Sequence, residues 1–216
     1  EISKAALVAE QMGQDHFTDL LAVSFSSPDY IGHTFGPNSV EAEDGFLRLD
    51  QELGAFLDFL DQHVGKEQYL LFLTADHGAA HVPGFLKEHK VPAGHINNEK
   101  LYNDLDSLLK IKFKNENLVL SIENYQIFIN HPLINAANLD KSKIKKTIID
   151  YVVQHPGISN VIDLEQLEQT TLNFTIKEKL ANGYYPSRSG DIQLIYRPQW
   201  LDNFEAGGTT HGLWNA

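Results

Sequence analysis

The chain has 216 residues, a net charge of −12, ten histidines and no cysteine. This length is enough for one well-buried domain or a large part of one. The lack of cysteine excludes a disulfide framework and thiol catalysis. Because phosphate backbones are bound by basic surfaces, the acidic balance argues against a nucleic acid polymer as partner. No apolar run approaches the roughly 20 residues of a membrane-spanning helix.

The first elements are predicted from short apolar patterns. Residues 1–14 carry apolar residues at helical spacing and predict an amphipathic helix. Leu20–Phe25 is a short apolar run, which predicts a buried strand of a parallel sheet. Pro28 and Gly32 follow this run and predict that the chain continues as a loop.

A helix and a second apolar run follow that loop. Residues 39–63 carry an apolar stripe at helical spacing, and Gly65 is expected to end this helix. Tyr69–Thr74 is again a short apolar run and predicts a second buried strand. Strand, helix and strand in this order predict an α/β fold, a mostly parallel sheet sandwiched by helices. Open sheets of this type place their sites at the carboxyl ends of strands.

The rest of the chain is predicted to add helices and strands that carry no motif for chemistry. Residues 78–94 are rich in proline, glycine and histidine and predict a loop. The later predicted elements are a helix over 97–109, a hairpin over 118–130 turning near Glu123-Asn124, a helix over 141–154 with Ile144, Ile148, Tyr151 and Val152 inward, a strand over 157–162, a helix over 171–180 and a strand over 191–196. We therefore expect residues 95–190 to be a scaffold between the chemistry-bearing segments.

Both ends of the chain indicate a piece of a longer polypeptide. The chain starts inside a helical pattern without an initiator methionine or a signal-peptide apolar region. It ends four residues after Gly212, just beyond a histidine that could be a ligand. Trp200 and Trp214 are expected to pack around this last segment.

Three separated segments carry side chains suited to metal binding. Asp29 and His33 lie in the first segment, Asp76 and His77 in the second, and His211 in the third. Carboxylate and imidazole donors without sulfur suit zinc or manganese. Each residue also has an ordinary alternative, since an aspartate can form a turn or cap a helix and a histidine can lie on the surface.

Neighbouring residues leave further alternatives open. Successive side chains of an extended segment point to opposite faces, so Asp76 and His77 either lie in a loop that re-aims them or serve two ions. His81, His89 and His95 could extend the metal site or contact a substrate. The expectation for these three is a loop position without a metal role.

In combination, these motifs resemble the alkaline phosphatase superfamily. The runs are Ser-Ser-Pro-Asp-Tyr-Ile-Gly-His-Thr-Phe-Gly-Pro from Ser26, Thr-Ala-Asp-His-Gly from Thr74 and Thr-His-Gly from Thr210. They are similar to bacterial alkaline phosphatases of the type I phosphodiesterase/nucleotide pyrophosphatase kind. The resemblance implies that residues 1–216 are the C-terminal portion of one alkaline phosphatase-like catalytic domain.

The resemblance also implies a site with two zinc ions. Asp29, His33 and His211 match the ligands of one zinc, and Asp76 and His77 match two ligands of the other. The remaining ligand and the threonine or serine nucleophile match no residue here. They are expected upstream, so no catalytic residue is assigned in this chain. Two divalent ions about 4 Å apart can clamp both ends of an in-line phosphoryl displacement.

The implied activity is hydrolysis of a phosphate monoester by a periplasmic or secreted bacterial enzyme. Hydrolysis of a phosphodiester or a nucleotide pyrophosphate is the alternative, because those relatives share the ligands found here. A manganese-dependent phosphoglycerate mutase-like enzyme matches the segment from Ser26 less well. The remaining alternative is that the isolated chain binds metal and catalyses no reaction. The sequence leaves the oligomeric state open.

Overall fold

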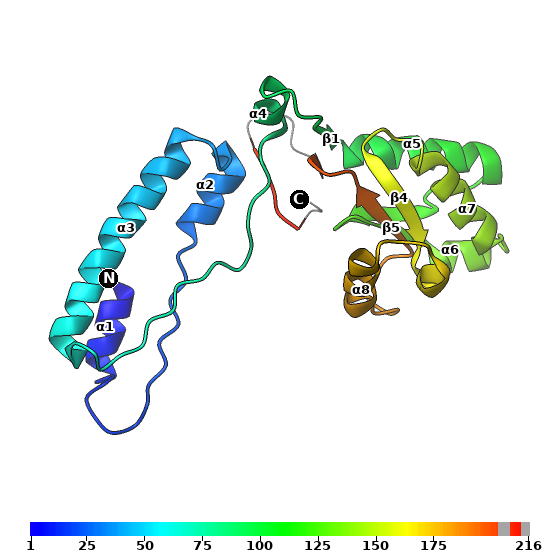
Figure 1. The fold of residues 1–216 in the computed structure, drawn as a ribbon. Helices are drawn as coiled ribbons and strands as arrows, with labels where there is room; N and C mark the ends of the chain where they lie inside the picture. The colour runs from blue at the N-terminus through cyan, green and yellow to red at the C-terminus, as the bar shows by residue number, and fades with distance from the viewer. Residues whose placement is uncertain (203–207, 213–216) are drawn as a thin grey trace. The chain divides into compact units, whose positions relative to one another are not determined.

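The computed structural model describes residues 1–202 and 208–212, which fall into two compact units. The first unit contains Glu1–Glu88 together with the described residues 208–212, and the second contains residues 89–202. Figure 1 shows helices and extended chain in the first unit and a sheet with helices in the second. None of the described helices is both long and apolar enough to cross a membrane.

The described part of the first unit is built from helices. They are α1 (Ile2–Ala9), α2 (Ser27–Phe35), α3 (Val40–Leu60), the π-helical turn Asp61–Gly65 and α4 (Pro83–Glu88). Ser39 caps α3, because its side chain accepts a hydrogen bond from the backbone N–H of Ala42 at 3.1 Å. The helix predicted over 39–63 is therefore confirmed. The first helix is shorter than predicted, and α4 lies where a loop was predicted.

The two apolar runs Leu20–Phe25 and Tyr69–Thr74 are not strands in this structure, which corrects the prediction. Both run as coil in Figure 1, and neither pairs with a strand among the described residues. Leu20 is 90% exposed and Phe72 is 81% exposed. A strand that is apolar on both faces needs neighbouring strands and covering helices. The described residues supply neither, so the runs stay extended and unpaired.

The second unit contains a four-stranded antiparallel sheet. Its strands, in spatial order, are β2 (Val119–Glu123), β3 (Gln126–Ile129), β5 (Ile192–Tyr196) and β4 (Ile158–Asp163). The turn residues Asn124 and Tyr125 have φ of 49° and 62°. Two successive positive φ values are typical of the tight turn that joins antiparallel strands. The predicted hairpin is therefore confirmed.

Parallel pairing among the described residues is confined to β1 (Gly94–Ile96) and β6 (Trp200–Asp202). The expected parallel sheet is thus not formed by the residues predicted to form it. In the antiparallel sheet, only β2 and β3 are joined by a turn too short for parallel pairing, since parallel strands need a long crossover. The α/β class itself holds, with strands and helices packed together.

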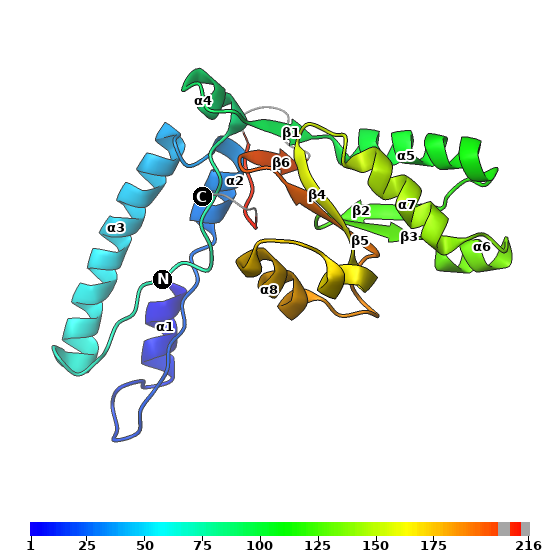
Figure 2. The same cartoon turned by 45° about the vertical axis from the view of Figure 1, so that its right-hand side comes forward.

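Helices cover both faces of the antiparallel sheet. They are α5 (Asn98–Phe113), α6 (His131–Ala136), α7 (Lys141–Val152), the 3₁₀ helix Leu164–Gln169 and α8 (Phe174–Gly183). Figure 2 shows α5 and α7 beside the sheet, and their buried residues join Leu194 and Tyr196 in the main core. Ile195 points to the other face and joins the cluster against which α8 packs. The helices and strands predicted in this region are confirmed, apart from their end residues.

Some details of the second unit differ from the prediction. Tyr151 was predicted to face inward and is 36% exposed, so that prediction is wrong. Strands β1 and β6 and helix α6 were not predicted. Trp200 packs against the main core, and a Cβ at Gly157 would lie only 2.2 Å from its ring. Trp214 lies outside the described residues.

Candidate metal centre

Helix α2 positions the first two candidate ligands, where the sequence had predicted a loop. Pro28 lies in the first turn, where its missing N–H costs no hydrogen bond, and Asp29 there is favoured by the helix dipole. Gly36 ends the helix with φ of 84°. Because Asp29 and His33 are four residues apart in a helix, their side chains share one face. The prediction was wrong because Pro28 and Gly32 were taken as breaks, although a proline in the first turn is compatible with a helix.

Three candidate ligands from the two ends of the chain converge in the first unit. One ligand atom each of Asp29, His33 and His211 lies within 4.8 Å of the others. The distance from Asp29 Oδ1 to His33 Nε2 is 3.4 Å, and the rings of His33 and His211 are 5.2 Å apart. Donors about 2 Å from one tetrahedral ion lie about 3.3 Å apart, so small side-chain movements suffice to place one ion here.

The second pair of candidate ligands lies beside this cluster. The imidazole of His77 stacks on His211 with ring centres 3.5 Å apart, and its Nε2 lies 3.9 Å from Asp29 Oδ1. Asp76 Oδ2 lies 3.5 Å from the same nitrogen, and Asp76 Oδ1 accepts a hydrogen bond from the backbone N–H of His77 at 3.0 Å. A loop therefore re-aims these two adjacent side chains toward one another.

The hydrogen bonds of two imidazoles fit a cation at this place. His33 Nδ1 lies 2.8 Å from the carbonyl oxygen of Thr209, and His77 Nδ1 lies 3.2 Å from that of Gly78. A carbonyl only accepts, so Nδ1 carries the hydrogen in both rings and Nε2 is left as the ligand nitrogen. Both Nε2 atoms face the carboxylate of Asp29. An acceptor facing an acceptor is stabilised by positive charge between them, so the donor set suits a metal ion.

The segment of the third ligand is held by a residue that the sequence analysis did not single out. Thr209 is fully buried, and its hydroxyl donates to the carbonyl oxygen of Ala80 at 2.7 Å. The signal that could have identified it is its place in the run Gly-Thr-Thr-His-Gly, two residues before the candidate ligand His211.

The three other histidines have different surroundings. His81 Nδ1 lies 2.6 Å from Asn38 Oδ1, and its ring stacks on Phe85. His89 and His95 belong to the second unit. None of the three is in the described group of converging metal-binding side chains.

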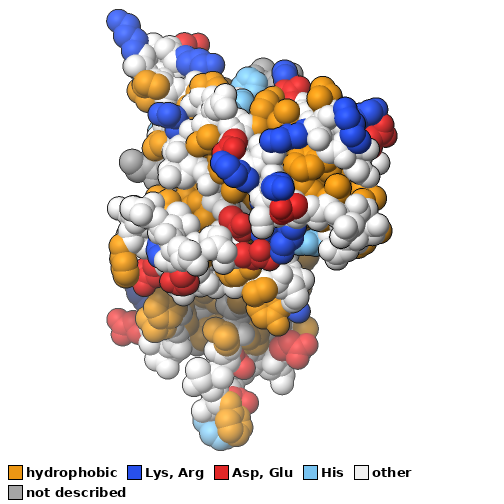
Figure 3. Space-filling view, turned by 90° about the vertical axis from the view of Figure 1, so that its right-hand side faces the viewer, with side chains coloured by type: hydrophobic (Ala, Val, Ile, Leu, Met, Phe, Trp, Pro, Cys, Tyr) orange, Lys and Arg blue, Asp and Glu red, His pale blue; other side chains and the backbone are white. Residues whose placement is uncertain are grey.

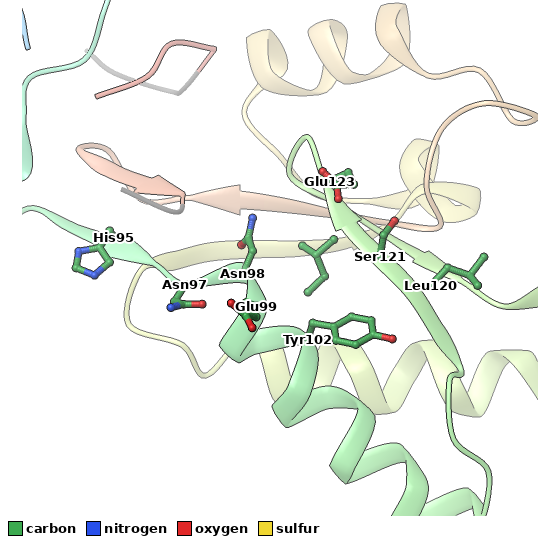
Figure 4. Close-up of a pocket in the computed structure, with 9 residues that line it drawn as sticks. His95, Asn97, Asn98, Glu99, Tyr102, Leu120, Ser121 and Glu123 are labelled. Carbon is green, nitrogen blue, oxygen red and sulfur yellow. The ribbon is translucent and has the colours of Figure 1, made fainter. Parts of the chain in front are cut away.

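A pocket of about 590 Å³ lies in the second unit, at the start of α5 and along β2 (Figure 4). It is lined by His95, Asn97, Asn98, Glu99, Tyr102, Leu120, Ser121, Ile122 and Glu123. Tyr196 donates to Asn98 Oδ1 at 3.1 Å beneath it, and burial raises the pKa of this tyrosine. None of the five candidate metal ligands lines this pocket, so the pocket is not part of the candidate metal centre.

Comparison with known proteins identifies the family of the chain. A family model described as type I phosphodiesterase / nucleotide pyrophosphatase matches residues 2–214. The chain belongs to this family. Within the family, alkaline phosphatase PhoV of Synechococcus elongatus is 46% identical over 215 residues, which are 100% of this chain and 38% of PhoV. Alkaline phosphatase PafA of Elizabethkingia meningoseptica is 38% identical over 216 residues, 100% of this chain and 39% of PafA.

A third relative carries a different name. A Myroides odoratus protein named calcium-transporting ATPase is 41% identical over 219 residues, 100% of this chain and 40% of that protein. The crystal structure of wild-type PafA matches this structure with a TM-score of 0.93 at 38% identity, over 99% of this chain and 41% of PafA. The alkaline phosphatase-like fold is therefore confirmed. The chain spans about two-fifths of the length of these relatives.

Proposed function

We propose that the polypeptide containing this chain hydrolyses phosphate monoesters at a two-zinc site. Asp29, His33 and His211 ligate one zinc, and Asp76 and His77 contribute to the other. The observation that carries the proposal is the approach of Asp29, His33 and His211 to within 4.8 Å, although His211 lies far from the other two in the sequence. The names of PhoV and PafA support the activity.

The chain's own residues orient the donors. Zinc, when bound, supplies positive charge that holds phosphoryl oxygens during the displacement. The backbone carbonyls of Thr209 and Gly78 fix the tautomers of His33 and His77, so that Nε2 faces the metal position. The carboxylate oxygen Oδ1 of Asp29 lies 3.4 Å from Nε2 of His33 and 3.9 Å from Nε2 of His77.

We also infer that residues 1–216 are the C-terminal portion of one alkaline phosphatase-like domain whose preceding part carries the nucleophile. The chain spans only 38% of PhoV and 39% of PafA. The exposed apolar runs Leu20–Phe25 and Tyr69–Thr74 need strands and helices that the described residues do not supply. Since the named phosphatase relatives are bacterial, we infer a periplasmic or secreted location.

Phosphodiester hydrolysis is the second candidate, because the family description names it. Hydrolysis of p-nitrophenyl phosphate and of bis-p-nitrophenyl phosphate by the full-length protein distinguishes the two activities. The proposal requires the larger kcat/KM for the monoester. A larger kcat/KM for the diester would assign the second activity instead.

The ligand assignment is tested with Asp29→Asn in the full-length protein. Loss of a residue that supports a metal ligand typically lowers activity about 10- to 100-fold, and loss of the ligand itself should lower activity at least as much. We expect such a loss in kcat/KM for p-nitrophenyl phosphate, with loss of one zinc equivalent after dialysis. The exposed Asp50→Asn in α3 is the matched control and should change neither value.

The isolated chain gives a second test of the same assignment. It keeps the three converging ligands but no assigned nucleophile, so we expect about one bound zinc and background turnover. Robust turnover by the isolated chain that Asp76→Ala abolishes would place the nucleophile within these residues and overturn the assignment.

A further inference from the structure

The segment around Thr209 is tied to two other parts of the first unit. The backbone N–H of Thr209 donates to the carbonyl oxygen of His33 at 3.1 Å, and its carbonyl oxygen accepts from His33 Nδ1 at 2.8 Å. The backbone N–H of Ala80 donates to the carbonyl oxygen of Thr210 at 3.0 Å. The Thr209 hydroxyl donates to the carbonyl oxygen of Ala80 at 2.7 Å. These four bonds join α2, the chain after His77 and the segment of His211.

The hydroxyl bond is the member of this set that a change of the Thr209 side chain removes directly. Thr209 is 0% exposed and Ala80 is 4% exposed, so water has little access to either group. A buried carbonyl that loses its donor costs about 1–3 kcal/mol, and the segment will shift to recover a partner. Of the other three bonds, two join backbone groups and one joins the His33 ring to the backbone carbonyl of Thr209, so all three survive a substitution at Thr209 only if the segment stays in place.

Thr209 connects two candidate ligands, one through a hydrogen bond and the other through the chain. Its carbonyl fixes the ring of His33, and His211 follows two residues later in the chain. Any displacement of this short segment therefore moves one ligand and releases the ring of another. Metal sites depend on such supporting contacts, whose loss costs roughly 10- to 100-fold in metal affinity.

We propose that Thr209 is a positioning residue for the metal centre: its buried hydroxyl holds the segment of His211 against Ala80, and so aligns His211 with His33. This inference rests on the proposed metal role of Asp29, His33 and His211. It assigns to Thr209 no contact with the metal or with the substrate.

The test compares Thr209→Val with Thr209→Ser in the full-length protein. All variants carry Asp76→Asn, so that binding at the second proposed position is weakened equally. Cobalt(II) is titrated, and its visible absorption reports the affinity and the coordination geometry. Valine keeps the shape of threonine and removes the donor, so we expect cobalt affinity to fall about 10- to 100-fold with an altered spectrum. Serine keeps the hydroxyl and should restore the affinity and the spectrum of the parent.

Thr34→Val is the matched control. Thr34 follows the candidate ligand His33 in α2, but it is exposed and its hydroxyl donates within the same helix, to the carbonyl oxygen of Tyr30 at 2.9 Å. Its cobalt affinity should equal that of the parent. If the valine variant is not recovered folded, Thr209→Ser and Thr209→Ala are compared in the same way. The serine variant should then bind cobalt like the parent, and the alanine variant should bind it more weakly.

The outcomes separate the inference from the proposed function. If Thr209→Val binds cobalt like the parent while Asp29→Asn does not bind it, the positioning role is wrong and the metal site stands. If Asp29→Asn also binds cobalt like the parent, the proposed site itself is wrong. Weak binding by the serine variant together with normal binding by the valine variant would show that the methyl packing of Thr209, not its hydroxyl, matters, and would overturn the inference.

Discussion

Lys145 in α7 is a buried lysine that pairs with two carboxylates of the second unit. It is 2% exposed, and its Nζ lies 2.7 Å from Asp163 Oδ1 and 3.0 Å from Glu165 Oε2. Burial by itself lowers the pKa of Lys145, but the hydrogen bonds with the two carboxylates outweigh it and raise this pKa. Hydrogen bonds from Lys141 and Lys145 lower the pKa of Glu165 to about 2. Acidic and basic side chains are interspersed on the face drawn in Figure 3.

Removing the buried ammonium should therefore destabilise the protein. Loss of one partner from a buried ion pair costs about 3–5 kcal/mol, and the partial exposure of Asp163 and Glu165 reduces this to about 2–3 kcal/mol for Lys145→Met. Lys146→Met is the matched control, because Lys146 is exposed and pairs only with Asp150 among the described residues. It should cost about 0.5 kcal/mol or less. Urea unfolding at neutral pH measures both, and equal costs would contradict this account.

At the scale of elements, the two exposed apolar runs matter most for how the chain behaves. Leu70, Phe72 and Leu73 are 80%, 81% and 73% exposed in this structure. Exposed extended chain of this kind pairs with other strands and promotes association. If the runs are inner strands in the full-length protein, the same side chains are buried there.

Phe72→Lys should have opposite effects in the two settings. In the isolated chain the added charge should reduce self-association, which analytical ultracentrifugation measures. In the full-length protein it should bury an unpaired charge and lower the free energy of unfolding by about 3 kcal/mol or more. Ile111→Lys is the control, since Ile111 is 71% exposed in α5 and should be tolerated in both. A tolerated Phe72→Lys in the full-length protein would show that Tyr69–Thr74 is not a buried strand.

At the scale of the whole molecule, the two units differ in how much core they possess. The main core of the second unit contains residues from β2, β3, β4 and β5 and from α5 and α7, many of them 0% exposed. In the first unit, the described buried apolar residues are few and scattered: Leu7, Ala42, Leu60, Ala80 and Leu86. A compact unit with its own core can fold alone.

We expect a polypeptide of residues 89–202 to fold without the rest of the chain. It should unfold in urea in one cooperative transition, followed by circular dichroism and by tryptophan fluorescence from Trp200. A polypeptide of residues 1–88 should show helical signal without a cooperative transition, because its apolar runs lack partners. Cooperative unfolding of residues 1–88, or the absence of cooperative unfolding in residues 89–202, would contradict the expectation that only the second unit folds alone.

Much of the local structure could be predicted from sequence because it depends on neighbouring residues. Ser39 and Asn97 cap the helices predicted after them, and the hairpin of β2 and β3 turns one residue later than predicted. Helix α2 was missed because Pro28 and Gly32 were taken as breaks. The candidate ligands could be named because Asp and His recur in three short segments and because these segments together resemble the alkaline phosphatase superfamily.

The sequence by itself determined the α/β class and most helix and strand positions in the second unit, because these follow from short-range patterns. The five candidate ligands were named from three short segments that resemble the alkaline phosphatase superfamily. Only the tertiary structure decided that Asp29 and His33 share a helical face and that Thr209 holds the segment of His211, and it gave the distances at which the expected approach of His211 to Asp29 and His33 occurs. It also decided that the apolar runs stay unpaired among the described residues. These features depend on contacts between distant segments, and the free energy of such contacts cannot be read from a local pattern.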